Sequence, residues 1–141
     1  MFSSNLNAAQ KYSNVGVTTG VMSASPHQLV VMLFEGASIA VSAARMHMQL
    51  RQMPEKAKAI SKAVSIIQDG LMASLDRTSG GELADRLFSL YEYMVARLTE
   101  ANVHNQPEPL EETAKLLNEL GDSWKSIGGD DARAGAQAGR E

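Results

Sequence analysis

The sequence predicts an all-α fold: an antiparallel up-down-up-down four-helix bundle with a short N-terminal helix or arm packed on it. Three observations lead to this prediction. Apolar residues recur with a helical period over four long segments, the breaks between these segments are short, and the chain of 141 residues has the length of one domain. Because the connections are short, neighbouring helices must run antiparallel.

Proline and glycine mark the limits of the four segments. The breaks are "RQMP", "RTSGG" and "HNQPEP". The predicted helices span about 26–51, 55–76, 82–103 and 109–127. Residues 25–127 are therefore the predicted bundle. Residues 1–24, rich in Ser, Asn, Thr and Gly, are the predicted arm, and residues 128–141, with no apolar residue larger than Ala, are a predicted disordered tail.

The first helix begins at "SPHQ" and carries more apolar surface than a half-buried helix needs. Ser25 and Gln28 have the spacing of a capping box, with Pro26 at the first helical position. The run "LVVMLF" then points all round the axis, so we divide it into a seam stripe and a second stripe that we expect to face outward. The seam stripe comprises Leu29, Leu33, Gly36, Ala40, Ala43, His47 and Leu50, and the second comprises Val30, Phe34, Ala37, Val41, Ala44 and Met48.

The second helix repeats this excess. A bulky stripe lies beside a stripe of mainly small residues, so the apolar arc again covers roughly 200° where little more than 100° is needed. The bulky stripe comprises Ala57, Ile60, Val64, Ile67, Leu71 and Leu75.

The third and fourth helices are ordinary bundle helices. Their apolar seams can be buried within the bundle, and we assign Tyr91 and Trp124 to structure. In "SGGE", Ser79 and Glu82 have the spacing of a second capping box.

The excess apolar surface on the first two helices must be covered, because monomers rarely expose large apolar patches. The cover is the N-terminal arm, a second copy in a homodimer, or a foreign helical segment. Methionines crowd the first helix and its exit, and their flexible thioethers suit a surface that accepts varied side chains. They are Met32, Met46, Met48 and Met53.

Composition narrows the functional class. The net charge of −3 argues against a nucleic-acid surface, and the absence of cysteine excludes disulfides and thiolate metal sites. No basic start with an apolar region and no apolar run of membrane length is present, so we expect a cytoplasmic protein without membrane insertion. The sequence has no Glu-x-x-His pair of the kind that binds iron in di-iron bundles, and it offers no Cys–His or Ser–His–Asp set for nucleophilic catalysis. We therefore predict no enzymatic activity, metal or cofactor.

Four stretches of the sequence carry a family resemblance. They are "YSNVGVTTGVMSASPHQLVVMLFEGA", "KAVSIIQDGL", "GGELADRLFSLYEYMVARLTEAN" and "LLNELGDSW", in this order and spanning about residues 12–127. Together they resemble the family of the flagellar secretion chaperone FliS. Glu35 in "MLFEGA" stands where that family commonly has Asp, which keeps the charge.

The resemblance implies a function. Proteins of this family bind newly made flagellin in the cytoplasm, wrap its disordered C-terminal segment as helices around the bundle, and prevent premature polymerisation before delivery to the export gate. The gate and flagellar regulatory proteins are further expected partners.

Helical phase then selects the flagellin contacts. On the second helix they are Ile60, Val64, Ile67 and Leu71, and on the first they are Val30, Phe34 and Val41. Tyr12 matches the family's N-terminal tyrosine, and we hypothesise that it covers the groove in the free protein, with Val15 and Val17.

A dimeric helical adaptor or regulatory protein is the alternative prediction, in which the excess faces meet across a two-fold axis. For the chaperone, we expect a monomer or weak homodimer when free.

Overall fold

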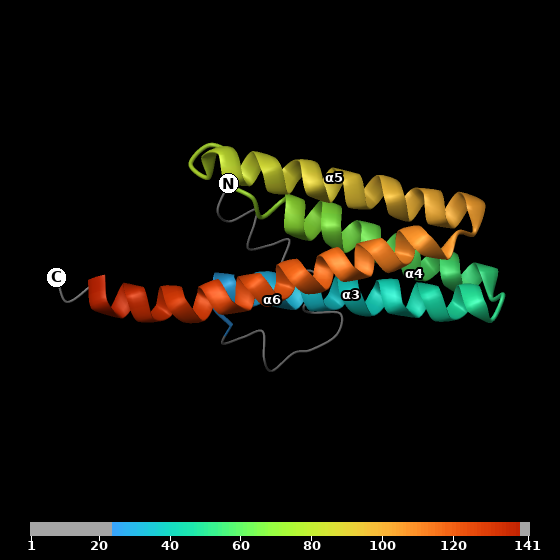
Figure 1. Ribbon diagram of the computed structural model, residues 1–141, viewed down its shortest axis with the longest axis horizontal. Helices are drawn as coiled ribbons and strands as arrows, with labels where there is room; N and C mark the ends of the chain where they lie inside the picture. Colours follow the sequence, from blue (N-terminus) through green and yellow to red (C-terminus); the bar gives the residue numbers. More distant parts are fainter. Residues whose placement is uncertain (1–23, 139–141) are drawn as a thin grey trace.

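The structure is a computed structural model that describes the backbone of residues 24–138 and the side chains of residues 24–127. Tyr12 and the predicted arm, apart from Ala24, lie outside the described residues. The described part of the chain contains four helices and no strand, which confirms the all-α class. The elements are α3 (Pro26–Gln49), α4 (Met53–Ser65) with its π-helical continuation η1 (Ile66–Met72), α5 (Gly81–His104) and α6 (Pro107–Ala138) (Figure 1).

The first capping box forms as predicted. Ser25 Oγ accepts a hydrogen bond from the Gln28 backbone N–H at 3.1 Å, and Gln28 Oε1 accepts one from the Ser25 N–H at 2.8 Å. The helix ends at Gln49, and Arg51 turns the chain with a left-handed φ of 58°.

The predicted second capping box is wrong. The N-cap of α5 is Gly80, without a side-chain hydrogen bond, and Gly81 has a positive φ of 59°. Ser79 instead donates its hydroxyl to Asp76, whose carboxylate also accepts the backbone N–H groups of Thr78 and Ser79, both at 3.1 Å. These hydrogen bonds, the Ser79 hydroxyl first, lower the pKa of Asp76. Asp76 therefore organises the turn before α5.

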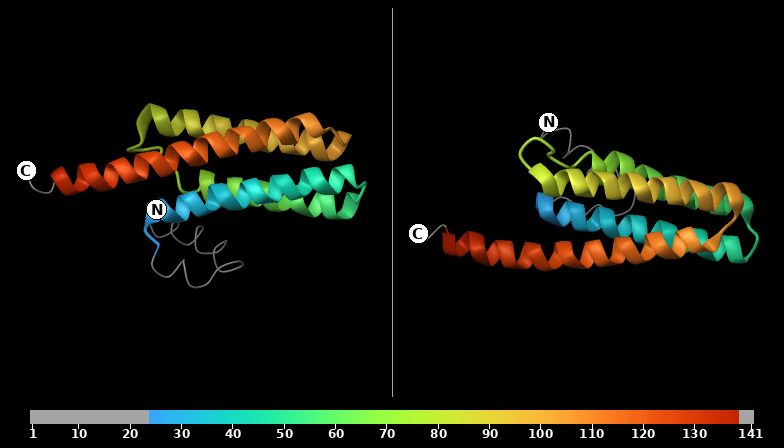
Figure 2. Two further views of the ribbon diagram at one scale, coloured as in Figure 1. Left: turned by 60° about the horizontal axis from the view of Figure 1, so that its bottom comes forward. Right: turned by 45° about the horizontal axis from the view of Figure 1, so that its top comes forward.

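Successive helices run in opposite directions, and α3 lies side by side with α4 and α6 (Figures 1 and 2). Two ion pairs fix the α3–α6 register: Glu35 with Lys125 at 3.0 Å and Arg45 with Glu111 at 3.7 Å. Residue numbers thus rise along α3 as they fall along α6, which is the antiparallel arrangement.

A buried lysine joins α4 to the end of α5. Lys56 Nζ donates to the Asn102 carbonyl at 3.0 Å and to Asn105 Oδ1 at 2.5 Å. The last carbonyls of a helix lack partners within it, and the negative end of the helix dipole favours a cation there. Lys56 therefore caps α5 from a neighbouring helix.

The second helix differs from its prediction near its end, where η1 takes over from α4. Ile66 and Ile67 are both buried although they are consecutive, and Gly70 comes so close to α3 that an added Cβ would lie 2.9 Å from Leu33 Cδ2. Ser74 Oγ donates to the Leu71 carbonyl at 2.9 Å. The π-helical segment thereby packs more of its residues against α3.

The fourth helix is longer than predicted. α6 continues to Ala138, beyond the predicted end near residue 127. Alanine, the strongest helix former, occurs four times in residues 128–138 and offsets the three glycines of the same stretch.

By length and composition, α3 could also cross a membrane. Core helices of soluble proteins share this property, and α3 contributes buried side chains to the bundle along most of its length. These are Leu29, Leu33, Phe34, Ala37, Ala40, Val41 and Ala44.

Candidate functional site

One face of α3 carries apolar side chains that the described helices leave partly or largely exposed. Six residues step along it by four and three positions and so share one side of the helix. They are Met32, Gly36, Ile39, Ala43, Met46 and Leu50, which we call the outer α3 stripe. Ile39 is 70% exposed, Leu50 60% and Met46 50%, and the other three are partly exposed. This stripe is the excess apolar surface that the sequence predicted, at a different helical phase.

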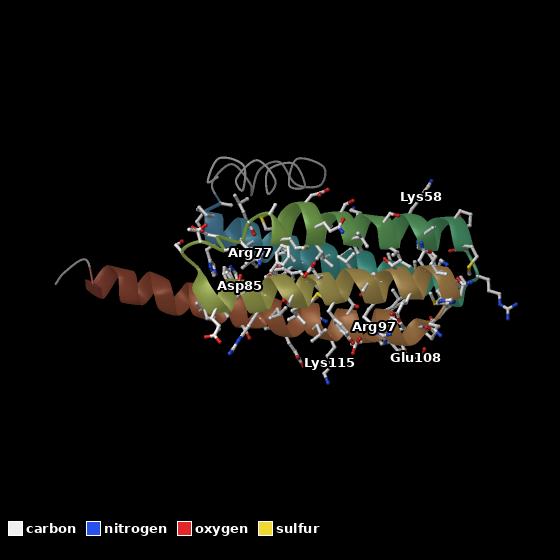
Figure 3. All side chains as sticks on the ribbon, turned by 90° about the horizontal axis from the view of Figure 1, so that it is seen from above. Lys58, Arg77, Asp85, Arg97, Glu108 and Lys115 are labelled. Carbon is white, nitrogen blue, oxygen red and sulfur yellow. The ribbon has the colours of Figure 1, made fainter. Side chains whose placement is uncertain are left out.

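One border of the outer α3 stripe is α4 with its continuation η1, which begins at Ile66. A Cβ added to Gly36 would lie 3.5 Å from Ile66 Cδ1, so Ile66 packs beside the stripe. Lys62 and Lys58 precede Ile66 by one and two helical turns on the exposed side of α4. Among the described side chains neither lysine forms an ion pair, and Figure 3 shows Lys58 directed away from the bundle. This border therefore offers unpaired positive charge.

The other border is an open groove of about 340 Å³ between α3 and α6. Ile39 and Leu117 contribute apolar lining, while Ser38 Oγ donates to Asn118 Oδ1 across the groove at 3.0 Å. The Glu35–Lys125 ion pair also lies along it. On this side Ser38 is therefore paired with Asn118, and Glu35 with Lys125.

The structure places most of the predicted contact residues in the core. The expectation that Phe34 and Val41 face outward is wrong, because both are buried, and so are three of the four residues predicted on the second helix, Ile60, Ile67 and Leu71. The cause on α3 is the position of α6: a Cβ on Gly121 would lie 3.3 Å from Phe34 Cβ. Val30 and Val64 are half-buried at the edge of the core.

Sequence reasoning missed Ile39, the most exposed large apolar residue of α3. A signal was present, since Met32, Ile39 and Met46 recur every seven residues. Gly36 and Ala43, which lie between them, were assigned to the seam instead.

The other polar clusters have structural roles. Arg97 bridges Glu112 on α6 at 2.8 Å and Glu100 on its own helix at 2.7 Å, and Tyr93 donates to Glu112 at 2.8 Å. The hydrogen bond from Arg97, followed by that from Tyr93, lowers the pKa of Glu112. The bonds to Glu112 join α5 to α6. Figure 3 labels Arg97 on α5. Within residues 24–127, no group of three or more His, Asp or Glu side chains could hold a metal ion.

The aromatic residues assigned to structure are packed accordingly. Tyr91 is buried, which raises the pKa of its hydroxyl, and its ring lies 6.3 Å from that of Phe34. Trp124 stacks on His27 with ring centroids 5.3 Å apart, joining α6 to the start of α3.

Comparisons with known proteins cover the whole bundle. Residues 8–131 match the family described as Flagellar protein FliS. The chain is 46% identical over 116 residues to the flagellar secretion chaperone FliS of Salmonella typhimurium. The aligned residues are 82% of this chain and 86% of that protein. The chain is 44% identical over 116 residues to the Escherichia coli FliS, with shares of 82% and 85%, and 42% identical over 122 residues to FliSB of Pseudomonas aeruginosa, with shares of 86% and 96%.

Proposed function

Because the chain belongs to the FliS family of flagellar secretion chaperones, we propose that it binds the disordered C-terminal segment of flagellin in the cytoplasm. It thereby prevents premature polymerisation of flagellin and assists its delivery to the flagellar type III export apparatus. FliS is a chaperone family and not an enzyme family, and the proposed activity is binding alone.

One observation carries the proposal: the outer α3 stripe leaves large apolar side chains bare on an otherwise packed helix. A bound segment that folds as an amphipathic helix would cover them. Removing Ile39, Met46 and Leu50 from water would each contribute on the order of 1 kcal/mol, given their present exposure. Ordering a disordered segment opposes this gain, so the complex remains reversible at the export apparatus.

The proposed contacts follow the observed exposure. From the residues selected by helical phase we retain Val30 and Val64 as proposed contacts, because they are half-buried at the edge of the core whereas the others are buried; Val30 lies off the outer α3 stripe, on the side of Phe34 and Val41. Tyr12 remains a proposed cover of the binding surface in the free protein. Deleting residues 1–18 should then raise both flagellin affinity and binding of an apolar dye, and unchanged values would contradict this role.

The decisive experiment is co-purification of the full chain with flagellin and with flagellin truncated before its C-terminal segment. We expect a one-to-one complex with the intact protein and none with the truncated one. Equal recovery of both, or of neither, would refute the proposal.

A dimeric adaptor is the second candidate, since the same bare stripe could meet a second copy. Sedimentation distinguishes them. An obligate dimer that does not bind flagellin favours the adaptor. A monomer or weak dimer that forms a one-to-one complex with flagellin favours the chaperone.

A further inference from the structure

We propose that Met46 is a redox-sensitive modification site: a peroxide oxidises its thioether to the sulfoxide, and the added oxygen weakens client binding while the fold stays intact. The inference rests on the proposed function, because Met46 belongs to the outer α3 stripe and the effect is measured as client affinity. It adds to that surface the control of its affinity by oxidation.

Thioethers are the oxidisable sulfur groups of this chain. The sequence has eight methionines and no cysteine, so no thiol is present to react first. Access to the dissolved oxidant then determines which thioether reacts. Met46 is 50% exposed, whereas Met94 is completely buried. The other described methionines are partly buried: Met32, Met48, Met53 and Met72. Among the described methionines, the Met46 side chain is therefore the most accessible.

The reaction needs only the thioether and the peroxide. A lone pair of Met46 Sδ attacks one oxygen of hydrogen peroxide, a sulfur–oxygen bond forms, and the oxygen–oxygen bond breaks with loss of hydroxide. The hydroxide takes the proton from the oxygen now bound to sulfur and leaves as water. Sulfur loses the electron pair that the peroxide gains. The products are water and the sulfoxide, which a methionine sulfoxide reductase converts back to the thioether.

Met46 lies where the added oxygen affects binding. It follows Ala43 by three residues and precedes Leu50 by four, so its side chain lies on the same side of α3 as the rest of the stripe. A ligand that covers the unmodified side chain buries an apolar thioether, which adapts its shape to the surface against it. A sulfoxide oxygen is a hydrogen-bond acceptor, and covering it without a donor weakens binding on the order of tenfold.

The fold should tolerate oxidation of Met46. Met32, Met48 and Met72 pack against the core, where a polar oxygen would cost stability, but Met46 is half exposed and lies outside that set. The backbone beside it is also held, since the Met46 carbonyl accepts the Leu50 N–H at 3.0 Å. Oxidation of Met46 is therefore expected to lower affinity without lowering stability.

Graded treatment of the full chain with hydrogen peroxide tests the inference. Peptide mapping by mass spectrometry should find the sulfoxide at Met46 before it appears at the other described methionines, with Met94 last. When Met46 is oxidised, calorimetric titration with the C-terminal segment of flagellin should show an affinity lower by roughly tenfold. The urea midpoint should stay unchanged, and a methionine sulfoxide reductase should restore the affinity.

Three variants identify the sulfur responsible. Met46→Leu keeps an apolar side chain of similar volume, so it should bind like the wild type before treatment and retain its affinity after it. The matched control is Met32→Leu on the same stripe, which should lose affinity on treatment as the wild type does. Met46→Gln introduces a polar acceptor without any oxidant and should weaken binding of the untreated protein.

The outcomes separate this inference from the proposed function. If Met46→Leu loses affinity on treatment as the wild type does, another methionine is responsible and the inference is wrong. It is also wrong if a partly buried methionine reacts before Met46, if the oxidised wild type keeps its affinity, or if its urea midpoint falls together with the affinity. In all these cases the chaperone proposal stands. A wild type that fails to bind the segment before treatment refutes the proposed function, and this role of Met46 with it.

Discussion

Replacing Phe34 by alanine tests the boundary between the core and the binding surface. Phe34 is 2% exposed, its ring lies 6.3 Å from the Tyr91 ring at an interplanar angle of 53°, and Gly121 on α6 allows close approach of the backbone. The substitution therefore removes a side chain from the contact of three helices.

The expected loss of stability follows from this burial. Truncating a buried phenylalanine to alanine costs about 3–5 kcal/mol, because apolar contact is lost and a cavity remains where neighbours cannot fully collapse. Gly121 has no side chain that could fill the space, so we expect a value in the upper half of this range. A domain is stable by only about 5–15 kcal/mol, so Phe34→Ala removes a large share of the total.

Urea denaturation followed by circular dichroism measures this loss. The midpoint should fall strongly for Phe34→Ala and by less than the equivalent of about 0.5 kcal/mol for the control Ile39→Ala, whose side chain is 70% exposed. An unchanged midpoint for Phe34→Ala together with weaker flagellin binding would show that Phe34 faces the client and that its placement in the core is incorrect.

Two further predictions concern polar contacts. Lys56→Met removes the ammonium that caps α5 through Asn102 and Asn105, and should lower the free energy of unfolding by about 1–3 kcal/mol with an unchanged urea slope; an unchanged midpoint would mean that water replaces these bonds. Asp76→Asn should destabilise the protein near pH 7 but not in acid. The pKa of Asp76 in the folded state lies below its ordinary value of 3.8. The ionised carboxylate therefore stabilises the fold above pH 3.8, and this stabilisation is lost as the pH falls through the lowered pKa. Thermal denaturation of the wild type and of Asp76→Asn from about pH 7 to pH 2 tests this, because their melting temperatures should converge as the pH falls. A difference in melting temperature that stays constant with pH would contradict the prediction.

Helical periodicity predicted the four helices and the excess of apolar surface on α3, since both depend on local spacing. It did not predict which stripe is bare. The sequence gives the angular position of a stripe around its own helix, but it does not give the positions of the neighbouring helices around that helix. Gly121 shows why: only the packed structure reveals that α6 approaches there and buries Phe34.

The π-helical segment was equally inaccessible from the sequence. Ile66 and Ile67 are adjacent, and in a regular α-helix they point about 100° apart. The structure buries both because the wider turn of η1 and the close contact of Gly70 with Leu33 bring this segment against α3. The same packing buries Leu71, so the prediction that Leu71 contacts flagellin is wrong.

The two sides of α3 separate folding from binding. Leu33, Phe34 and Val41 face the core, whereas Ile39 and Met46 lie on the opposite side, where the described helices leave them largely exposed. Because the core side is complete without a ligand, release of a client need not destabilise the chaperone. Substitutions on the core side should therefore change the unfolding free energy first, and substitutions on the outer α3 stripe should change affinity alone. A stripe variant that lost stability and affinity together would show that the bare face belongs to the fold.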